Sequence, residues 1–151
     1  MIARLRGQVS WMGQDALIVD VGGVGYRVRV PRSLLDGVGI GESIHLHTHL
    51  HVRENEMALY GCASEEELAL FETLLGVSGI GPRSALNILS ATAPETLRAT
   101  IADGDVAALS HIPGIGRRTA ERLVAELKDR LGGGEATATG RPSAGDAEVV
   151  A

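Results

Sequence analysis

Residues 76–89, GVSGIGPRSALNIL, and residues 111–124, HIPGIGRRTAERLV, are two copies of one pattern set 35 positions apart. Five of seven consecutive positions around the central glycines are identical in the two copies. The matched residues include Gly79, Ile80, Gly81 and Arg83 in the first copy and Gly114, Ile115, Gly116 and Arg118 in the second. Agreement at a fixed spacing predicts that one supersecondary unit occurs twice.

In each copy, a Gly-Ile-Gly turn leads into a predicted helix that begins with Pro82-Arg83 or Arg117-Arg118. The N-terminus of a helix presents unpaired N–H groups and the positive end of the helix dipole, so it binds anions. Arginines in the first turn add positive charge without reading a base, which makes a DNA phosphate the natural anion. We therefore predict a tandem helix-hairpin-helix domain that grips the DNA backbone. For either copy alone, a plain glycine turn between helices is the alternative.

The helical period extends over residues 64–132. Ser64 and Glu67 form a predicted capping box ahead of an apolar stripe. The stripe consists of Leu68, Phe71, Leu74 and Leu75, and further helices are predicted over residues 82–91, 94–102, 106–110 and 117–131. Residues 133–151 are rich in Gly, Ala, Ser and Thr, which predicts a flexible linker or tail.

Residues 1–63 alternate between apolar and polar side chains, as strands do. Strands are predicted over residues 4–11, 15–21, 26–30, 43–52 and 56–61, with a helical turn at 33–36. The glycines of GGVGY (22–26) supply a strand-to-strand turn, because Val28 stands where a dinucleotide-binding pattern needs glycine. Five short strands fit a small closed barrel. An isolated antiparallel sheet with a helix laid on it is the alternative.

Composition and charge exclude several classes of function. The chain is 44% hydrophobic and has a net charge of −5. This charge is 0 for residues 1–63, −3 for residues 64–132 and −2 for residues 133–151. Because no segment is basic overall, a surface that binds nucleic acid must be a local arrangement of basic residues. Lys128 is the only lysine and lies outside any glycine-rich turn, which excludes a phosphate-binding loop of the ATPase type. Cys62 is the only cysteine, which excludes an internal disulfide and favours a reducing compartment. Without a signal peptide or an apolar span, we expect a cytoplasmic protein with no membrane contact.

Other residues with reactive or metal-binding side chains give weaker signals. His45, His47, His49 and His51 alternate along one strand face, but no acid or cysteine lies among them, so we expect a polar surface and assign them no role. Cys62 is expected to be a small buried hydrophobe. No pattern of catalytic residues stands out, and no metal or cofactor site is predicted.

Several segments in order resemble the RuvA family of Holliday-junction branch-migration proteins. They are MIARLRG (1–7), VDVGGVGYRV (19–28), THLHVRENEMALYGC (48–62), LFETLLGVSGIGPRSALNIL (70–89) and LSHIPGIGRRTAERLVAELKDRL (109–131). The resemblance covers residues 1–132. It implies an α+β fold with an N-terminal five-stranded OB-type β-barrel (1–63), an all-helical tandem helix-hairpin-helix domain (64–132) and a linker (133–151).

The resemblance also implies a function in DNA recombination, repair and the SOS response. The family forms a homotetramer, or two tetramers that sandwich the DNA, and holds a four-way junction open in a square plane. It is not an enzyme itself: the RuvB ATPase drives branch migration and RuvC resolves the junction. The implied DNA-binding residues are Gly79, Ile80, Gly81, Arg83, Gly114, Ile115, Gly116, Arg117 and Arg118.

The family's acidic pin maps onto Glu54, Asn55 and Glu56, with Asn55 where an Asp is usual. Relatives contact RuvB through a small C-terminal helical domain that this sequence does not include, so the sequence is either a fragment or a version without motor coupling. In either case we expect this form not to stimulate RuvB. Two other classes remain as alternatives. One is a generic duplex-binding helix-hairpin-helix adaptor. The other is a lyase or glycosylase of the same type, which is weakened because Lys128 is the sole lysine amine.

Overall fold

The structure, a computed structural model, describes residues 1–132, so the linker expected at 133–151 lies outside the described residues. The chain forms two compact units that divide between Pro94 and Glu95. Among the described residues, no helix is long and apolar enough to cross a membrane.

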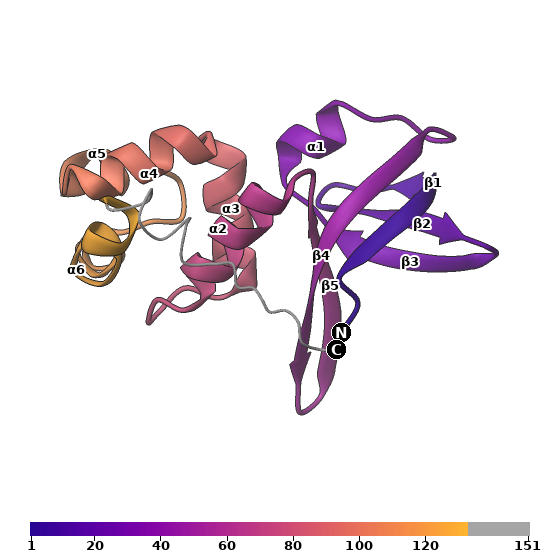
Figure 1. Cartoon of the computed structure of the whole chain (residues 1–151), viewed down its shortest axis with the longest axis horizontal. Helices are drawn as coiled ribbons and strands as arrows, with labels where there is room; N and C mark the ends of the chain where they lie inside the picture. The colour runs from indigo at the N-terminus through magenta and orange to yellow at the C-terminus, as the bar shows by residue number, and fades with distance from the viewer. Residues whose placement is uncertain (133–151) are drawn as a thin grey trace, which may run out of the picture. The chain divides into compact units, whose positions relative to one another are not determined.

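The first unit begins with five strands that close into a barrel in the order β1-β2-β3-β5-β4 (Figure 1). The strands are β1 (Arg4–Met12), β2 (Ala16–Val21), β3 (Val24–Arg29), β4 (Ser43–Arg53) and β5 (Glu56–Cys62). All neighbours are antiparallel except β3 and β5, which pair in parallel through Val28↔Leu59 and Arg29↔Tyr60. The closed barrel that the alternation predicts is therefore confirmed. The alternative prediction, an isolated antiparallel sheet with a helix laid on it, is wrong.

Apolar side chains on alternate positions fill the barrel. Leu17, Val19, Val28 and Leu46 have no exposed surface. The short helix α1 (Arg32–Asp36) contributes Leu35 to the same core. Burial of this aliphatic set is the main force that closes the barrel, since each such side chain contributes about 1.5–3 kcal/mol when removed from water.

Strands β4 and β5 form a long hairpin that continues beyond the barrel (Figure 1). Arg53 and Glu56 form its last pair, so Glu54 and Asn55 make the turn. Strand β5 pairs with β3 only from Leu59 onward. The part of the hairpin between Leu59 and the turn therefore has no neighbouring β3 strand. Val52 and Met57 face each other there and are 60% and 72% exposed.

Helix α2 (Glu65–Leu75) packs on the outer face of this hairpin, and α3 (Pro82–Ala91) follows it within the same unit. Phe71 stacks on Tyr60 with ring centroids 5.5 Å apart. Half of the expected capping box is present: the Glu67 N–H donates to Ser64 Oγ at 3.1 Å, but the Glu67 carboxylate accepts the N–H of Ala63 at 3.2 Å and not that of Ser64. The compact unit therefore extends past residue 63, because two helices of the expected helical domain pack with the barrel.

The second unit contains α4 (Pro94–Ala102), α5 (Val106–Ser110) and α6 (Arg117–Gly132). Its core consists of Leu97, Ile101, Leu109, Ile115, Ala120, Leu123 and Leu127. Asp105 caps α5 by accepting the Ala108 N–H at 3.0 Å. These helices agree with the ranges that the periodicity predicts.

Candidate nucleic-acid interface

The two Gly-Ile-Gly turns have the same backbone conformation. Gly79 has φ +92° and Gly114 has φ +91°, a left-handed region that side chains other than glycine rarely adopt. No non-glycine residue in the described part of the chain has a positive φ. The 35-residue repeat in the sequence is thus also a repeat in the structure.

Matching hydrogen bonds hold each turn. Ile80 N–H donates to Val77 O at 3.1 Å, and Ile115 N–H donates to Ile112 O at 3.0 Å. Ile80 and Ile115 are 5% and 4% exposed. Their side chains therefore anchor the turns in the core, and their N–H groups are already engaged. The structure gives both isoleucines a packing role.

The second glycine of each turn stands at the start of a helix. The carbonyls of Gly81 and Gly116 accept the first helical hydrogen bonds, from Ala85 and Ala120, both at 2.9 Å. A Cβ built on either glycine would meet no heavy atom within 4 Å. The space in front of Gly81 and Gly116 is open, so a ligand can approach the backbone there.

The arginines beside these turns are exposed. Arg83 Nη1 lies 3.4 Å from Asp15 Oδ2, and Arg117 Nε lies 3.4 Å from Glu121 Oε2. Both pairs are more than half exposed, and such pairs contribute at most about 1 kcal/mol. Arg118 has no ion pair with any other residue from 1 to 132. All three guanidinium groups can therefore turn to an incoming phosphate at little cost.

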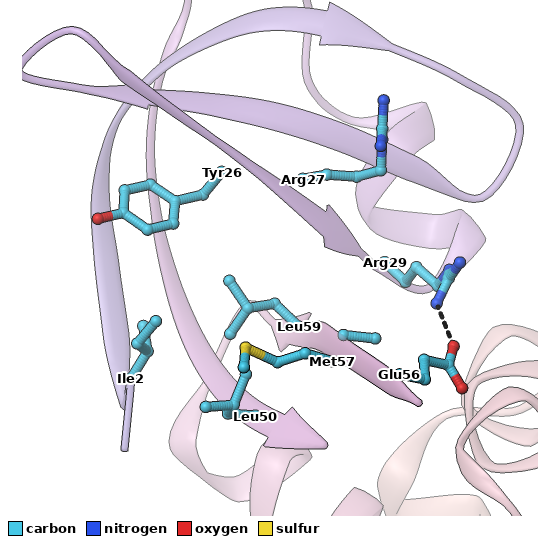
Figure 2. A pocket seen from close by; sticks show the side chains of 9 residues that line it. Ile2, Tyr26, Arg27, Arg29, Leu50, Glu56, Met57 and Leu59 are labelled. Carbon is cyan, nitrogen blue, oxygen red and sulfur yellow. Dashed lines mark ion pairs between the residues drawn. The ribbon is translucent and has the colours of Figure 1, made fainter. Parts of the chain in front are cut away.

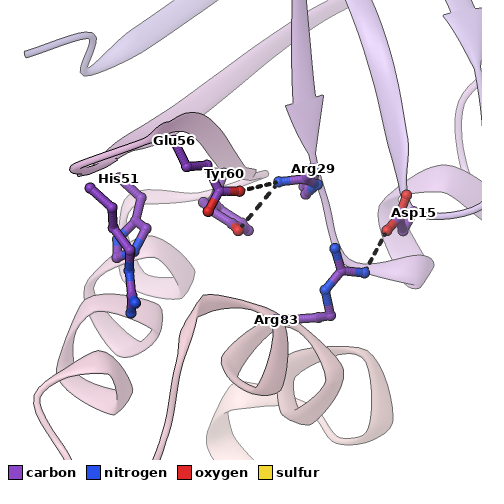
Figure 3. A network of polar contacts seen from close by, with 7 residues as sticks. Asp15, Arg29, His51, Glu56, Tyr60 and Arg83 are labelled. Carbon is purple, nitrogen blue, oxygen red and sulfur yellow. Dashed lines mark hydrogen bonds and ion pairs between the residues drawn. The ribbon is translucent and has the colours of Figure 1, made fainter.

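The acidic turn at the end of the β4–β5 hairpin divides into two parts. Glu54 and Asn55 are exposed at the turn itself. Glu56 Oε2 instead lies 3.8 Å from Arg29 Nη1 on β3, beside a pocket lined by apolar side chains such as Met57 and Leu59 (Figure 2). Arg29 Nη1 is also 3.5 Å from the Tyr60 hydroxyl (Figure 3). The three residues expected to form the pin therefore do not share one environment.

The histidine row forms local contacts on the outer face of β4. His45 and His47 have ring centroids 5.0 Å apart. His49 Nδ1 lies 2.9 Å from Glu72 Oε2 on α2, and His51 Nε2 accepts a hydrogen bond from Arg53 Nε at 2.9 Å. Within residues 1–132, no three histidine, cysteine or acidic side chains lie close enough to hold a metal ion.

Cys62 is fully buried, as the sequence predicts. Burial raises the pKa of its thiol far above the ordinary value of 9.0, and the negative charges of Glu67 and Glu72 raise it further. A thiol in this state is neutral and unreactive. Cys62 is therefore a core residue.

Sequence reasoning missed the residues around Arg83. Asp15, Arg29 and Arg32 share a pocket with it, although no local motif marks any of them. The only signal available was that Arg29 and Arg32 lie near the end of a predicted strand, where side chains leave the barrel. Their association with Arg83 arises from tertiary packing within the first unit.

Comparison with known proteins agrees with this geometry. The family model described as the RuvA N terminal domain matches residues 1–61, and the one described as a SAM-like helix-hairpin-helix tandem matches residues 71–129. These ranges cover the barrel and the two repeated turns.

Relatives named Holliday junction branch migration complex subunit RuvA match along most of their own length. The one from Herpetosiphon aurantiacus is 54% identical over 133 residues, which is 87% of this chain and 68% of the relative. The one from Chloroflexus aggregans is 46% identical over 144 residues (95% and 74%), and the one from Mycolicibacterium smegmatis is 46% identical over 132 residues (87% and 68%). The chain therefore belongs to the RuvA family.

Proposed function

We propose that this chain binds four-way DNA junctions as a homotetramer and serves as the non-catalytic DNA-binding subunit of a branch-migration complex. The observation that carries the proposal is the pair of matched turns, each with a left-handed glycine, an open glycine and an exposed arginine. Relatives of this family bear the name of such a complex. In the proposed complex, which acts in the cytoplasm, RuvB is the ATPase and RuvC the resolvase, and we assign no RuvB contact to residues 1–132.

Backbone recognition explains how an acidic chain can bind DNA. The net charge of −5 repels phosphates at long range, so the attraction must come from a few local contacts. Gly79, Gly81 and Arg83 are the proposed contacts of the first turn, with Ile80 holding its shape. Gly114, Gly116, Arg117 and Arg118 are those of the second, with Ile115 in the same supporting role. None of these groups reads a base, so binding is independent of sequence.

In a tetramer, the backbone contacts of each chain occur four times, and their arrangement allows the assembly to recognise the shape of the DNA. A tetramer provides two turns for each arm of a junction, and contacts on four arms reinforce one another through effective concentration. In the same arrangement, the acidic turns of four chains surround the junction centre, where Glu54 repels phosphates and disfavours a continuous duplex.

A competition gel shift tests the proposal directly. The protein is titrated against a four-way junction and against linear duplex of equal length at the same salt concentration. We expect the junction to bind more tightly, and unlabelled duplex to compete poorly. Equal affinity for the two DNAs would contradict the proposal and favour a generic duplex-binding adaptor.

A further inference from the structure

A second pocket lies in the first unit, beside the first Gly-Ile-Gly turn. Its volume is about 460 Å³, within the usual range of ligand pockets. One wall is a single face of α3, formed by Arg83, Leu86, Asn87 and Ser90 at helical spacing. The opposite wall comes from the β1–β2 connection, the end of β3 and the start of α1, and includes Gln14, Asp15, Arg29 and Arg32.

The walls are joined by defined hydrogen bonds. Arg32 N–H donates to Ser90 Oγ at 2.9 Å, and Ser90 Oγ–H donates to Leu86 O at 2.8 Å. The start of α1 is therefore fastened to α3 through its backbone. This link uses the backbone N–H of Arg32 and not its guanidinium. The backbone of Arg32 is therefore fixed at the pocket, while its side chain forms no ion pair there.

The lining is strongly cationic for so acidic a chain. It contains three arginines and a single carboxylate, Asp15. Arg29 is balanced by Glu56 and Arg83 by Asp15 (Figure 3). Arg32 Nη1 donates only to a backbone carbonyl, Gln14 O at 3.1 Å, and has no carboxylate partner among residues 1–132. The pocket therefore holds one positive charge that the protein does not neutralise.

We propose that this pocket binds a phosphate group through Arg83 and Arg32, and that Asp15 occupies Arg83 when the pocket is empty. The inference rests on the proposed function, because Arg83 belongs to the first turn, and it extends that DNA contact onto the barrel. Asp15 acts as an internal competitor: a phosphate must displace its carboxylate from Arg83. The pair is 69% and 59% exposed, so this displacement costs little.

Two variants and two matched controls test the pocket. Asp15→Asn removes the competitor, and Arg32→Gln removes the unbalanced charge while keeping the backbone link to Ser90. Asp20→Asn makes the same charge change outside the pocket and keeps an oxygen for the Gly23 N–H. Arg6→Gln removes an exposed arginine from β1. Junction affinity is measured by fluorescence anisotropy over a series of salt concentrations, with melting temperature as the folding control.

We expect Asp15→Asn to tighten binding by roughly two- to fivefold at low salt, the value of an exposed ion pair. For each pocket that contacts DNA, Arg32→Gln should weaken binding by roughly tenfold or less and lower the salt slope by about 1. Both controls should stay within about twofold of the unmodified chain. If Asp15→Asn matches Asp20→Asn and Arg32→Gln matches Arg6→Gln, the pocket takes no part and the inference is wrong. If Arg32→Gln lowers the melting temperature, its weaker binding could reflect lost stability. The comparison of Asp15→Asn with Asp20→Asn then tests the inference.

A second arm distinguishes the source of the phosphate. Inorganic phosphate is exchanged for chloride at constant ionic strength while the side-chain N–H signals of the arginines are followed by NMR. Shifts at Arg32 and Arg83 in the unmodified chain, with a weaker shift at Arg83 in Arg32→Gln, would show that free phosphate also enters. A response to DNA alone would assign the pocket to the DNA backbone.

Failure of this inference can be separated from failure of the proposed function. If the unmodified chain prefers junctions but the pocket variants behave as their controls, only the pocket assignment fails. If the unmodified chain shows no junction preference, the proposed function fails. The pocket variants can then still be compared on linear duplex and inorganic phosphate.

Discussion

The carboxylate of Glu56 lies 3.8 Å from the guanidinium of Arg29, an ion pair that directs it toward β3. Glu54 stands at the turn itself and has no ion pair with another described residue. The two glutamates both lie at the end of the hairpin, yet only Glu54 carries its charge there without an ion partner among the described residues. If the turn acts as an acidic pin, Glu54 carries most of its effect.

Glu54→Gln is therefore expected to raise affinity for linear duplex at low salt and to narrow the preference for junctions. Glu56→Gln should have a smaller effect, because its carboxylate is held back on the barrel side. Both effects should fade as salt increases, since the Debye length is only about 10 Å at 0.1 M. Anisotropy titrations of duplex and junction at two salt concentrations measure this.

Glu42→Gln is the matched control for these variants, because Glu42 accepts a loop N–H from Gly39 and the glutamine can keep that bond. It should leave both affinities unchanged. An unaltered duplex affinity for Glu54→Gln at low salt would mean that the turn is an ordinary hairpin end with no role in junction selection.

The two glycines of each turn should respond differently to substitution. Gly81→Val and Gly116→Val place a side chain in open space, so the fold should survive while phosphate approach is blocked. Gly79→Ala forces alanine into a left-handed conformation, which costs about 1–2 kcal/mol of stability. Chemical denaturation and junction titration separate the two effects.

Gly37→Ala serves as the control, because its φ is −102° and the nearest atom to a new Cβ lies 3.6 Å away. It should change neither stability nor binding much. The proposed contact would be refuted if Gly81→Val and Gly116→Val kept native circular dichroism and full DNA affinity.

The local elements of the fold could be predicted from the sequence because their signals are local. The repeat around Gly79 and Gly114 and the Ser64 cap are each confined to one short stretch, and the structure reproduces them. Barrel closure is different. It depends on two parallel pairs between β3 and β5, Val28↔Leu59 and Arg29↔Tyr60, which no alternation pattern can specify.

The side-chain pairs that shape the candidate site were also beyond sequence reasoning. Arg83 and Asp15 are 68 positions apart and meet only because α3 packs within the barrel unit. Which arginine of a helix is paired, and with what, is decided by this packing. The repeated turns could therefore be predicted from the sequence, whereas the three-arginine pocket could not; the role of the turns as DNA contacts stays a prediction.

Cys62 should not react with thiol reagents in the folded protein. Its raised pKa keeps the thiol neutral from pH 6 to 9, so the labelling rate should stay low across this range. Because the folded-state pKa exceeds the ordinary value of 9.0, stability is retained below that pH and decreases as pH rises above it. Labelling with and without denaturant, at several pH values, measures both effects.

Cys62→Ala should fold with a loss of about 1 kcal/mol, since it removes one buried sulfur without adding a polar group. Cys62→Ser buries a hydroxyl and should cost more. Rapid labelling of the native protein at pH 7 would contradict the buried position of this residue.

Assembly into a tetramer would multiply the few DNA contacts that one chain offers. Each chain offers two proposed backbone contacts, one in each compact unit, and a net charge of −5 opposes them. Two contacts are too few for tight binding at physiological salt, because each neutralised phosphate contributes only about one unit of salt slope. A tetramer combines eight contacts on one junction and so accounts for binding by an acidic chain.

Light scattering without DNA should therefore report about four times the chain mass of 15.8 kDa at micromolar concentration. The mass should persist at high salt if apolar surface holds the subunits together. Titration into a labelled junction should then saturate at one tetramer per junction, or at two if tetramers enclose it from both faces. A monomer in solution that also binds the junction one chain at a time would contradict the four-fold arrangement and leave the hairpins as independent duplex contacts.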